Sequence, residues 1–448
     1  MLNQSFTGEN FRKIFDYENR KGNYLEGDFF PDVAEATNKI RICNKELIAL
    51  RRNRRFLSKD VFKKRLTELI ITKKQLKGFK ESLLSQRLER VGQEVTNNGI
   101  SSKMIKIILN DKKPVYSIKR TPTAFFAIKQ IQHNIKRLYK VKQSNRHEIV
   151  CQLLSVLGDS FPKYIIRTDI ESFYESIPRD RLLNSINKEE LLTSSSKKII
   201  RLLLKDYELL SLNKNGIPRG IGVSAYLAEI YMRDFDNSIK AKPEVIYYAR
   251  YVDDIIVIFA PSLVGLSKNF MSFMSEKANL MGLTLNDSKT TEHNLLQPKD
   301  DNLEYLGYKI HFGNGDIKIN LSENKIRKYQ TRMRRSFAAY VCKRQFNERK
   351  ARSLLIKRIK FLTSNTRLIN NKSNILTGIY FTNSLLSNSD DLLALDKYLT
   401  ILIDSLKSEI IEKRLRNFTF YKGFNEQRYV SFKSNELAKI VKVWKYGT

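Results

Sequence analysis

Two adjacent acids interrupt an apolar segment of the sequence. Asp253 and Asp254 lie in the middle of "YARYVDDIIVIFA", residues 248–260. A buried carboxylate without a partner is costly, so such acids are usually paired, protonated or bound to a metal ion. A tight turn between two strands is the simpler interpretation, because Asp is common in the turns that join strands. The segment by itself leaves both interpretations open.

A third acid has an equivalent setting upstream. In "YIIRTDIESFYESI", Asp169 ends an apolar segment that is predicted to be a strand. A strand ending in Asp and a hairpin with Asp-Asp at its tip can lie side by side in one sheet, which would bring Asp169, Asp253 and Asp254 together. Three clustered carboxylates repel one another unless hard divalent cations lie among them, and Mg²⁺ prefers oxygen ligands. Two such ions roughly 3.5–4 Å apart can activate an attacking hydroxyl and stabilise a leaving pyrophosphate, which is the chemistry of nucleotidyl transfer.

The segments that must position these acids mix strand and helix patterns. Between about 160 and 320 the chain is β-rich, with helical patterns such as 179–210 and 264–281 between the strands, and Asn314-Gly315 is a hairpin turn signal. This mixture predicts an α+β domain with an antiparallel sheet.

Basic helical patterns flank this region. They cover residues from about 35 to 110 and again from 321 onward, with apolar residues at intervals of three and four and Lys and Arg between them. The apolar stripes predict core packing. The basic faces could lie along phosphates.

The net charge is the most unusual property of the composition. Lys plus Arg number 81 against 47 Asp plus Glu, which gives +34 over 448 residues. Such an excess indicates a polyanionic partner, with nucleic acid as the first candidate. An anionic membrane is the weaker alternative, since no basic amphipathic anchor or lipidation signal stands at either end.

Other partners and compartments are disfavoured. The sequence has no secretory h-region and no apolar run approaching about 18 residues, so a cytoplasmic protein is expected. Three scattered cysteines, Cys43, Cys151 and Cys342, form neither a disulfide framework nor a zinc site. A catalytic metal would therefore need oxygen ligands.

Five motifs resemble a known family. "DIESFY", "NGIPRGIGVSAYLAEIYM", "YVDD", "GLTLNDSKT" and "EYLGYKI" occur in the order of the palm motifs of reverse transcriptases, over roughly 160–312. The resemblance implies an RNA-directed DNA polymerase with a right-hand polymerase fold. The expected divisions are a basic helical N-terminal extension (1–105), fingers and palm (106–320), and a basic helical thumb and C-terminal region (321–448).

The same resemblance assigns the metal site. Asp169 resembles the first metal-binding aspartate, with the backbone carbonyl of Ile170 as a further ligand. Asp253 resembles the second metal-binding aspartate, and Asp254 the supporting acid of the site. The implied cofactor is a pair of Mg²⁺ ions, with Mn²⁺ as an alternative.

Three further residues match positions that contact substrate in the family. Tyr174 resembles the bulky gate that excludes a ribose 2′-hydroxyl, with core packing as the alternative. Arg219 replaces the Gln of a Pro-Gln-Gly turn, where it could hold a template phosphate or form a salt bridge to an acid such as Glu229. Lys289 resembles the lysine near the leaving pyrophosphate, with an exposed surface lysine as the alternative. "YLGY" at 305–308 resembles the primer grip.

The residues of the fingers are harder to identify from the sequence. Lys142 and Arg146 are the best candidates for contacts to the triphosphate of an incoming dNTP, with Arg120 and Lys129 behind them. The alternative for each is a general basic contact.

Several domains that accompany other reverse transcriptases have no signal in this sequence, which limits the classes that it can resemble. The sequence contains no set of acids that would indicate an RNase H domain. It also contains no Cys/His pairs that would indicate a zinc endonuclease. The chain resembles the bacterial unknown-group and defence-associated reverse transcriptases, many of which act in anti-phage systems. This implies an RNA template in the form of a dedicated non-coding RNA, a DNA product, and either a second reverse transcriptase or a homo-oligomer as partner. A retron or group II intron-type enzyme, an RNA-dependent RNA polymerase and a non-catalytic RNA-binding palm protein are the alternatives.

Overall fold

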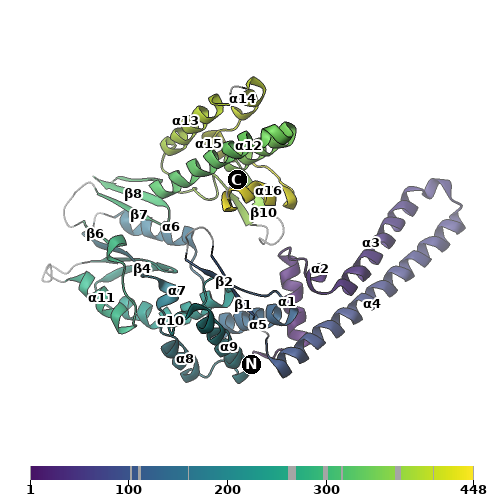
Figure 1. Cartoon of the computed structure of the whole chain (residues 1–448), viewed down its shortest axis with the longest axis horizontal. Coiled ribbons are helices and arrows are strands. Elements are labelled where there is room, and N and C mark those ends of the chain that lie inside the picture. The colour runs from purple at the N-terminus through teal and green to yellow at the C-terminus, as the bar shows by residue number, and fades with distance from the viewer. Residues whose placement is uncertain are drawn as a thin grey trace. The chain divides into compact units, whose positions relative to one another are not determined.

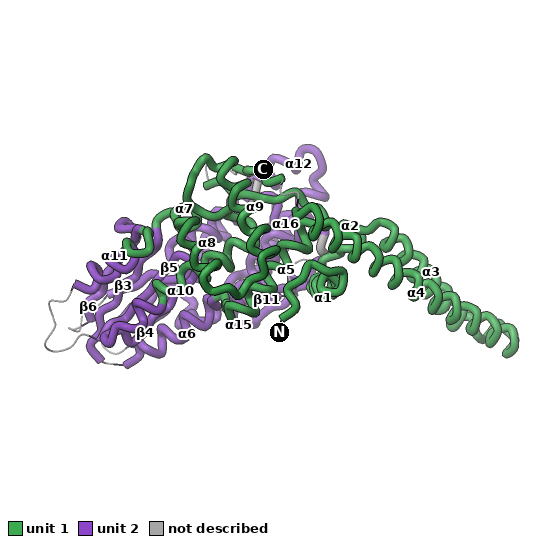
Figure 2. The backbone as a smooth tube through the Cα atoms, turned by 90° about the horizontal axis from the view of Figure 1, so that it is seen from below, with its two compact units in different colours: residues 1–143, 171–236, 279–283 green, residues 144–170, 237–278, 284–448 purple. Residues whose placement is uncertain are grey.

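The computed structural model describes residues 2–100, 103–108, 113–159, 161–260, 269–295, 301–313, 316–368, 375–406 and 408–446. The chain forms two compact units, shown in different colours in Figure 2. Unit 1 contains residues 1–143, 171–236 and 279–283, and unit 2 contains residues 144–170, 237–278 and 284–448. Because these units interleave along the sequence, the three linear divisions expected from the sequence stay a prediction. The expected Asn314-Gly315 turn and residues 264–268 lie outside the described residues.

The N-terminal part of unit 1 is helical, and its helices are labelled in Figure 1. They are α1 (Gly8–Arg20), α2 (Leu25–Phe29), α3 (Pro31–Arg52), the 3₁₀ turn η1 (Arg54–Phe56), α4 (Lys59–Asn98) and α5 (Pro122–Leu138). Helix α4 begins where the Ser58 hydroxyl accepts a hydrogen bond from the Val61 amide, and it ends at Gly99, which has φ +70°. The root of α4 packs on α1 and α5, and α3 runs beside it.

The sequence pattern overestimated this helical region. Residues 104–107, inside the expected helical range of 35–110, form strand β1 (Met104–Ile107), which pairs with β2 (Val115–Ile118). The left-handed conformation at Gly99 ends the helix first. The rest of unit 1 contains α7 (Phe173–Ser176), α8 (Arg179–Lys188), α9 (Ser194–Ser211) and most of α10 (Gly222–Lys240).

Unit 2 contains the sheet that carries the acids. Its strands are β3 (Tyr164–Asp169), β4 (Val245–Tyr251), β5 (Asp254–Phe259) and β6 (Thr291–Asn294), in the order β4-β5-β3-β6 with every pair antiparallel. The expected α+β class with an antiparallel sheet is confirmed. Its core includes Ile165, Ile256 and Ile258, all fully buried. Around it lie α6 (Arg146–Leu157), α11 (Phe270–Leu280) and the 3₁₀ turn η2 (Asp287–Lys289).

A second antiparallel sheet follows along the chain. It consists of β7 (Asp301–Tyr305), β8 (Tyr308–Gly313) and β9 (Asp316–Leu321), in that order. The C-terminal region is helical, as expected, apart from a short β10–β11 pair. Its elements are α12 (Glu323–Leu362), β10 (Asn365–Leu368), β11 (Ile375–Gly378), α13 (Asp390–Asp404), α14 (Glu409–Leu415), α15 (Phe420–Asn425) and α16 (Ser434–Tyr446).

Helix α12 is interrupted in its second half. Asn347 has φ −159°, so two helical segments meet there. Buried side chains of both segments, including Met333 and Leu355, pack with Leu395 and Leu399 of α13. Among the described residues, no helix is long and apolar enough to span a membrane. The cysteines are free, with Cys43 buried and the other two exposed.

Candidate active site

The pairing of β3 with β5 brings two of the predicted acids together. Asp169, the last residue of β3, lies directly opposite Asp254, the first residue of β5. Tyr251 of β4 also lies opposite Asp254, so Val252 and Asp253 form a two-residue hairpin turn. The turn interpretation and the clustered-acid interpretation are therefore compatible, because the turn is what carries Asp253 to the end of β3.

The turn has an uncommon backbone conformation. Val252 has φ +63°, a region that β-branched residues rarely adopt. Two hydrogen bonds hold the turn: Arg250 Nη1 donates to the Val252 carbonyl at 2.9 Å, and the Ile170 amide donates to the Asp253 carbonyl at 3.3 Å. Strained residues of this kind persist only where the surroundings fix them, and they are frequent at functional sites.

The three carboxylates interact electrostatically. Asp169 is only 4% exposed. Burial raises the pKa of Asp253, and the negative charges of Asp169 and Asp254 raise it further. The cluster therefore favours a positive ion beside it.

Two cations of the chain already pair with this cluster. The Lys289 ammonium contacts Asp169, and this hydrogen bond is the main cause of a raised pKa for Lys289. Arg167 Nη2 contacts Asp254 Oδ1 at 3.0 Å, while Arg167 Nη1 donates to the Lys289 carbonyl at 2.9 Å. Sequence reasoning missed Arg167, although its position two residues before Asp169 puts it on the same face of the strand.

The donor set fits a hard divalent cation by its chemistry. It consists of carboxylate oxygens, and the pKa of Asp253 is raised by burial and then by the charges of the other two acids. Within the described ranges, no group of three or more His, Cys, Asp or Glu side chains is arranged to hold a metal ion. Asp169 and Asp254 instead pair with Lys289 and Arg167.

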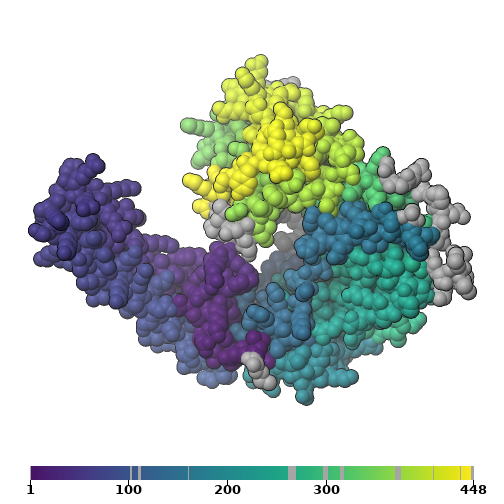
Figure 3. Space-filling model, turned by 180° about the vertical axis from the view of Figure 1, so that it is seen from behind, coloured from purple at the N-terminus to yellow at the C-terminus, as the bar shows by residue number. Residues whose placement is uncertain are grey.

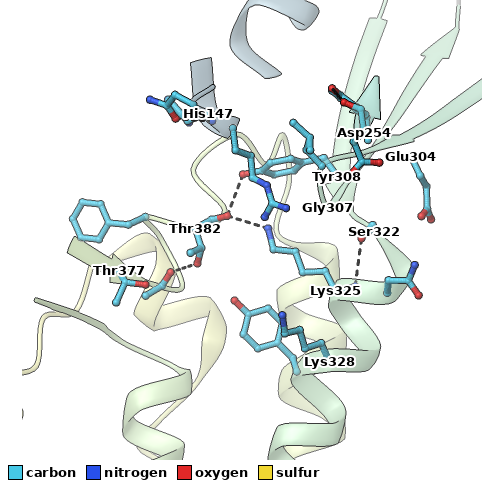
Figure 4. A pocket seen from close by; sticks show the side chains of 18 of the residues that line it. His147, Asp254, Glu304, Gly307, Tyr308, Ser322, Lys325, Lys328, Thr377 and Thr382 are labelled. Atoms are coloured by element: carbon cyan, nitrogen blue, oxygen red, sulfur yellow. Dashed lines mark hydrogen bonds between the residues drawn. The ribbon is translucent and has the colours of Figure 1, made fainter. Parts of the chain in front are cut away.

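A groove of about 940 Å³ in unit 2 contains the acids (Figure 4). Its other walls come from the start of α6, the turn between β7 and β8, the first turns of α12 and the segment after β11. Its cationic side chains are Arg146, Arg167, Lys289, Lys325, Lys328 and Arg332. The groove thus combines an acidic end with several cations, which suits a polyanion whose reactive end meets the carboxylates.

The turn between β7 and β8 has the tight form expected for "YLGY". Tyr305 lies opposite Tyr308, and the two residues between them, Leu306 and Gly307, have φ values of +46° and +83°. Positive φ at both central residues is typical of the turns favoured in two-residue hairpins. The Tyr305 hydroxyl donates to the Asp254 carbonyl at 3.4 Å, which links this turn to the acids.

Lys325 lines the same groove and was also missed from the sequence. Its ammonium donates to the Thr382 carbonyl at 3.0 Å and lies 4.5 Å from the centre of the Tyr308 ring (Figure 4). Burial lowers the pKa of Lys325 to about 8, and the charges of Arg146 and Lys328 act in the same direction. The one local signal was its place three residues after Ser322, the N-cap of α12.

Tyr174 and Arg219 lie together in unit 1. The Arg219 guanidinium lies 5.8 Å from the centre of the Tyr174 ring and pairs with Glu175 at 3.2 Å. The acid beside Arg219 is therefore Glu175 and not the expected Glu229, because the turn places Arg219 next to helix α7. The Tyr174 carbonyl accepts from the Ile217 amide at 2.7 Å, which joins α7 to this turn.

The candidates for the fingers separate into two groups. Arg146 begins α6 in unit 2, lines the groove and lies 5.5 Å from the centre of the Tyr251 ring. Lys142 is exposed and belongs to unit 1. Arg120 and Lys129 pair with carboxylates of the N-terminal helices, at 2.8 Å with Asp28 and 3.1 Å with Glu18. These pairs give Arg120 and Lys129 structural partners.

Comparisons with solved structures find distant similarity to telomerases. Apo telomerase from Candida tropicalis matches at 14% identity and a TM-score of 0.37, over 79% of this chain and 65% of that one. Telomerase from Candida albicans in complex with the TWJ fragment of telomeric RNA matches at 13% identity and a TM-score of 0.33, over 66% of this chain and 55% of that one. Each match thus covers between half and two thirds of the telomerase chain. Comparison with curated proteins finds no match.

A family comparison is more informative about the site. The family described as reverse transcriptase (RNA-dependent DNA polymerase) matches residues 112–310, a range that includes all three acids, Lys289 and the "YLGY" turn. The sheet within these residues carries the acids where the end of β3 pairs with the start of β5, as in the palm of a right-hand polymerase. Residues 112–310 therefore form a reverse transcriptase domain, the enzyme domain of RNA-directed DNA polymerases.

Proposed function

We propose that this protein is an RNA-directed DNA polymerase that extends a primer with deoxynucleotides and uses two divalent metal ions. The observation that carries the proposal is the register of the sheet, which sets Asp169 opposite Asp254 with Asp253 in the adjoining turn. The groove beside these acids and the family match over residues 112–310 support it.

Asp169, Asp253 and the backbone carbonyl of Ile170 would hold the ions, with Asp254 as the supporting acid. Bound Mg²⁺, or Mn²⁺ in its place, would activate the primer hydroxyl and stabilise the leaving pyrophosphate. The contact of Lys289 with Asp169 places its ammonium beside the position where the leaving pyrophosphate would lie. Arg167 holds the Asp254 side chain through its 3.0 Å contact.

Removal of the acidic charges tests the catalytic assignment. Asp253→Asn combined with Asp254→Asn should lower dNTP incorporation on a primed RNA by at least about a hundredfold, because loss of one preorganised electrostatic group already costs that much in other enzymes. RNA binding should persist. The control Asp180→Asn removes one exposed acid from α8 and should retain activity. Full activity of the double variant would refute the assignment.

We also propose that Tyr174 sets the preference for deoxynucleotides. Tyr174→Ala should raise incorporation of rNTPs relative to dNTPs on one primed template, because a smaller side chain leaves room for the 2′-hydroxyl. Tyr174→Phe keeps the ring and should leave the ratio unchanged. An unchanged ratio in Tyr174→Ala would assign the ring a packing role, with Arg219 at 5.8 Å as its partner.

The biological role proposed here is anti-phage defence in a bacterium, with a dedicated non-coding RNA as template. The second palm motif, "RGIGVSAYLAEIYM", resembles that of the A protein of the type 3 defence-associated reverse transcriptase system. A second reverse transcriptase or a homo-oligomer is the proposed partner. Arg219 lends this template proposal little support, because its guanidinium is paired with Glu175. Sequencing of the DNA that copurifies with the protein tests it: a short or repetitive product is expected, and long copies of varied cellular RNAs would contradict it.

A further inference from the structure

The distal part of the α3–α4 hairpin, residues 51–77, carries an unusual density of exposed cations. Farther along α4, the root of the hairpin buries Leu84, Leu88 and Val91, whereas most side chains of the distal part are exposed (Figure 3). Between residues 51 and 65 every Lys and Arg is exposed: Arg51, Arg52, Arg54, Arg55, Lys59, Lys63, Lys64 and Arg65. One acid, Asp60, lies among them.

Two cations of the root differ because they have carboxylate partners. Lys80 pairs with Glu26 at 2.6 Å, and Arg87 pairs with Asp32 at 2.6 Å. Across the part of the chain that the structure describes, none of the eight cations between residues 51 and 65 pairs with a carboxylate. Their charge is therefore available to an external polyanion.

The lysines of α4 form a stripe along one side of the helix. Lys59, Lys63, Lys74 and Lys77, with Ile70 between them, recur at the spacing of one helical face, and all five are exposed. At 1.5 Å per residue the stripe is about 27 Å long. Its two pairs of lysines, one at each end of the stripe, can contact phosphates at two places along a nucleic-acid stem.

An exposed aromatic ring stands at the tip. Phe56, in η1, is 87% exposed and follows Arg54 and Arg55. The Arg54 guanidinium lies 5.5 Å from the centre of the Phe62 ring, which orders it beside the turn. Aromatic rings next to arginine are the surfaces on which proteins stack unpaired bases of RNA loops.

We propose that the distal hairpin docks a structured RNA, with stem phosphates along the α4 lysines and an unpaired loop base on Phe56. This contact does not depend on polymerase activity and lies outside the reverse transcriptase domain of residues 112–310. An anionic membrane fits less well, because Val61, Ile70, Ile71 and Phe79, the exposed apolar residues of α4, do not share one face. An acidic protein surface would not explain the exposed ring of Phe56, which directly follows two arginines.

A charge-matched pair of variants tests the phosphate contacts. Lys63→Gln with Lys74→Gln removes two stripe lysines, and Lys13→Gln with Lys39→Gln removes two exposed lysines that pair with Glu9 at 2.8 Å and Glu35 at 3.0 Å. The probe is an RNA stem-loop, titrated at several salt concentrations. The stripe variant should lose about tenfold or more in affinity near 0.1 M salt and about two units of salt slope. Equal losses in both variants would overturn the proposal.

A second pair of variants tests the ring. Phe56→Ala should weaken the stem-loop roughly fivefold to a hundredfold and leave a blunt RNA duplex unaffected. Phe79→Ala removes another exposed ring, 60% exposed on α4, and should change neither affinity. An unchanged stem-loop affinity in Phe56→Ala would refute base stacking.

The remaining measurements separate this proposal from catalysis. The stripe variant should extend a short primed template as the parent protein does, and the Asp253→Asn, Asp254→Asn variant should bind the stem-loop normally. Loss of short-template extension in the stripe variant would overturn a separate docking role. Stronger loss of binding to phosphatidylserine vesicles or to a poly-glutamate peptide than to the stem-loop would assign the surface to a membrane or to an acidic protein.

Discussion

At the scale of single residues, Lys325 has the least common electrostatic setting in the groove. Its ammonium contacts a carbonyl and an aromatic ring, and no carboxylate within the described residues pairs with it. Burial lowers the pKa of Lys325 to about 8, and the charges of Arg146 and Lys328 add to this effect. A phosphate in the groove would supply the missing negative charge and favour the protonated form.

This setting predicts a pH dependence of nucleic-acid binding. As pH rises from 7 to 9, Lys325 passes its pKa of about 8 and loses its charge, so affinity for a primed RNA should fall. The stability of the free protein depends on pH in the opposite direction. Between pH 8 and pH 10.5, approximately, the unfolded chain binds more protons at Lys325 than the folded chain does, so the free energy of unfolding rises with pH. Binding measured at both pH values should show a flatter dependence in Lys325→Met. Lys328→Gln, in the same groove, should weaken binding while the pH dependence persists.

The residue scale also shows what sequence motifs can find. Asp169, Asp253, Asp254 and Lys289 were predicted because their motifs combine residue type with spacing, and the structure brings them together. Lys325 escaped prediction because its properties depend on Tyr308 and Thr382, which no local pattern links to it.

At the scale of elements, the turn before α10 depends on one glycine. Gly220 has φ +99°, and a Cβ there would lie 2.4 Å from Val115 Cγ1 and 2.7 Å from the Tyr116 carbonyl oxygen. The Arg219 carbonyl accepts a hydrogen bond from the Tyr116 amide at 2.7 Å, and this bond connects the turn to β2. The Val115 side chain and the Tyr116 backbone therefore leave no room for a side chain at residue 220.

Gly220→Ala should therefore destabilise the protein, by roughly 1–3 kcal/mol for the strained backbone and more for the contact with β2. Gly78→Ala is the matched control, because that glycine lies inside α4 and no atom beyond the adjacent helix backbone lies within 4 Å of the place that the new methyl group would take. The control should stabilise by about 0.5–1 kcal/mol, since alanine favours helix. Chemical denaturation measures both. A Gly220→Ala variant as stable as the parent would contradict the close packing.

Element boundaries were harder to predict than element types. The pattern over 179–210 is two helices, α8 and α9, and the first basic region is divided into α3 and α4 by Asn53 to Ser58. Apolar periodicity continues across such breaks because both helices bury the same kind of face. Caps and left-handed residues decide where each helix stops, and those depend on contacts that the pattern does not contain.

At the scale of the whole molecule, the charge of +34 is distributed over both units. Unit 1 carries the distal hairpin cations, and unit 2 carries exposed cations of α12 such as Arg334 and Lys343. RNA affinity should fall steeply with salt, by about 0.7–0.9 log units per phosphate contact per decade.

Neutralisation of cations in α12 should lower that slope. Arg334→Gln with Lys343→Gln should reduce it by about two units for a primed RNA. The control is Arg327→Gln with Arg416→Gln, since those arginines pair with Glu323 and Asp404. Isothermal or fluorescence titration over a salt series gives the slopes. Equal slopes for parent and test variant would show that α12 does not contact the RNA backbone.

The pairing of Lys289 with Asp169 and of Arg167 with Asp254 has a consequence for the order of assembly. In small metal-dependent domains the chain stays unfolded until an ion offsets its ligands. Here the polypeptide brings its own counter-charges to the strand ends. Folding can therefore finish before any ion binds. A chelator should abolish the proposed polymerase activity without unfolding the protein. The supply of ions, and not the completion of the fold, would then decide when a newly made molecule becomes active.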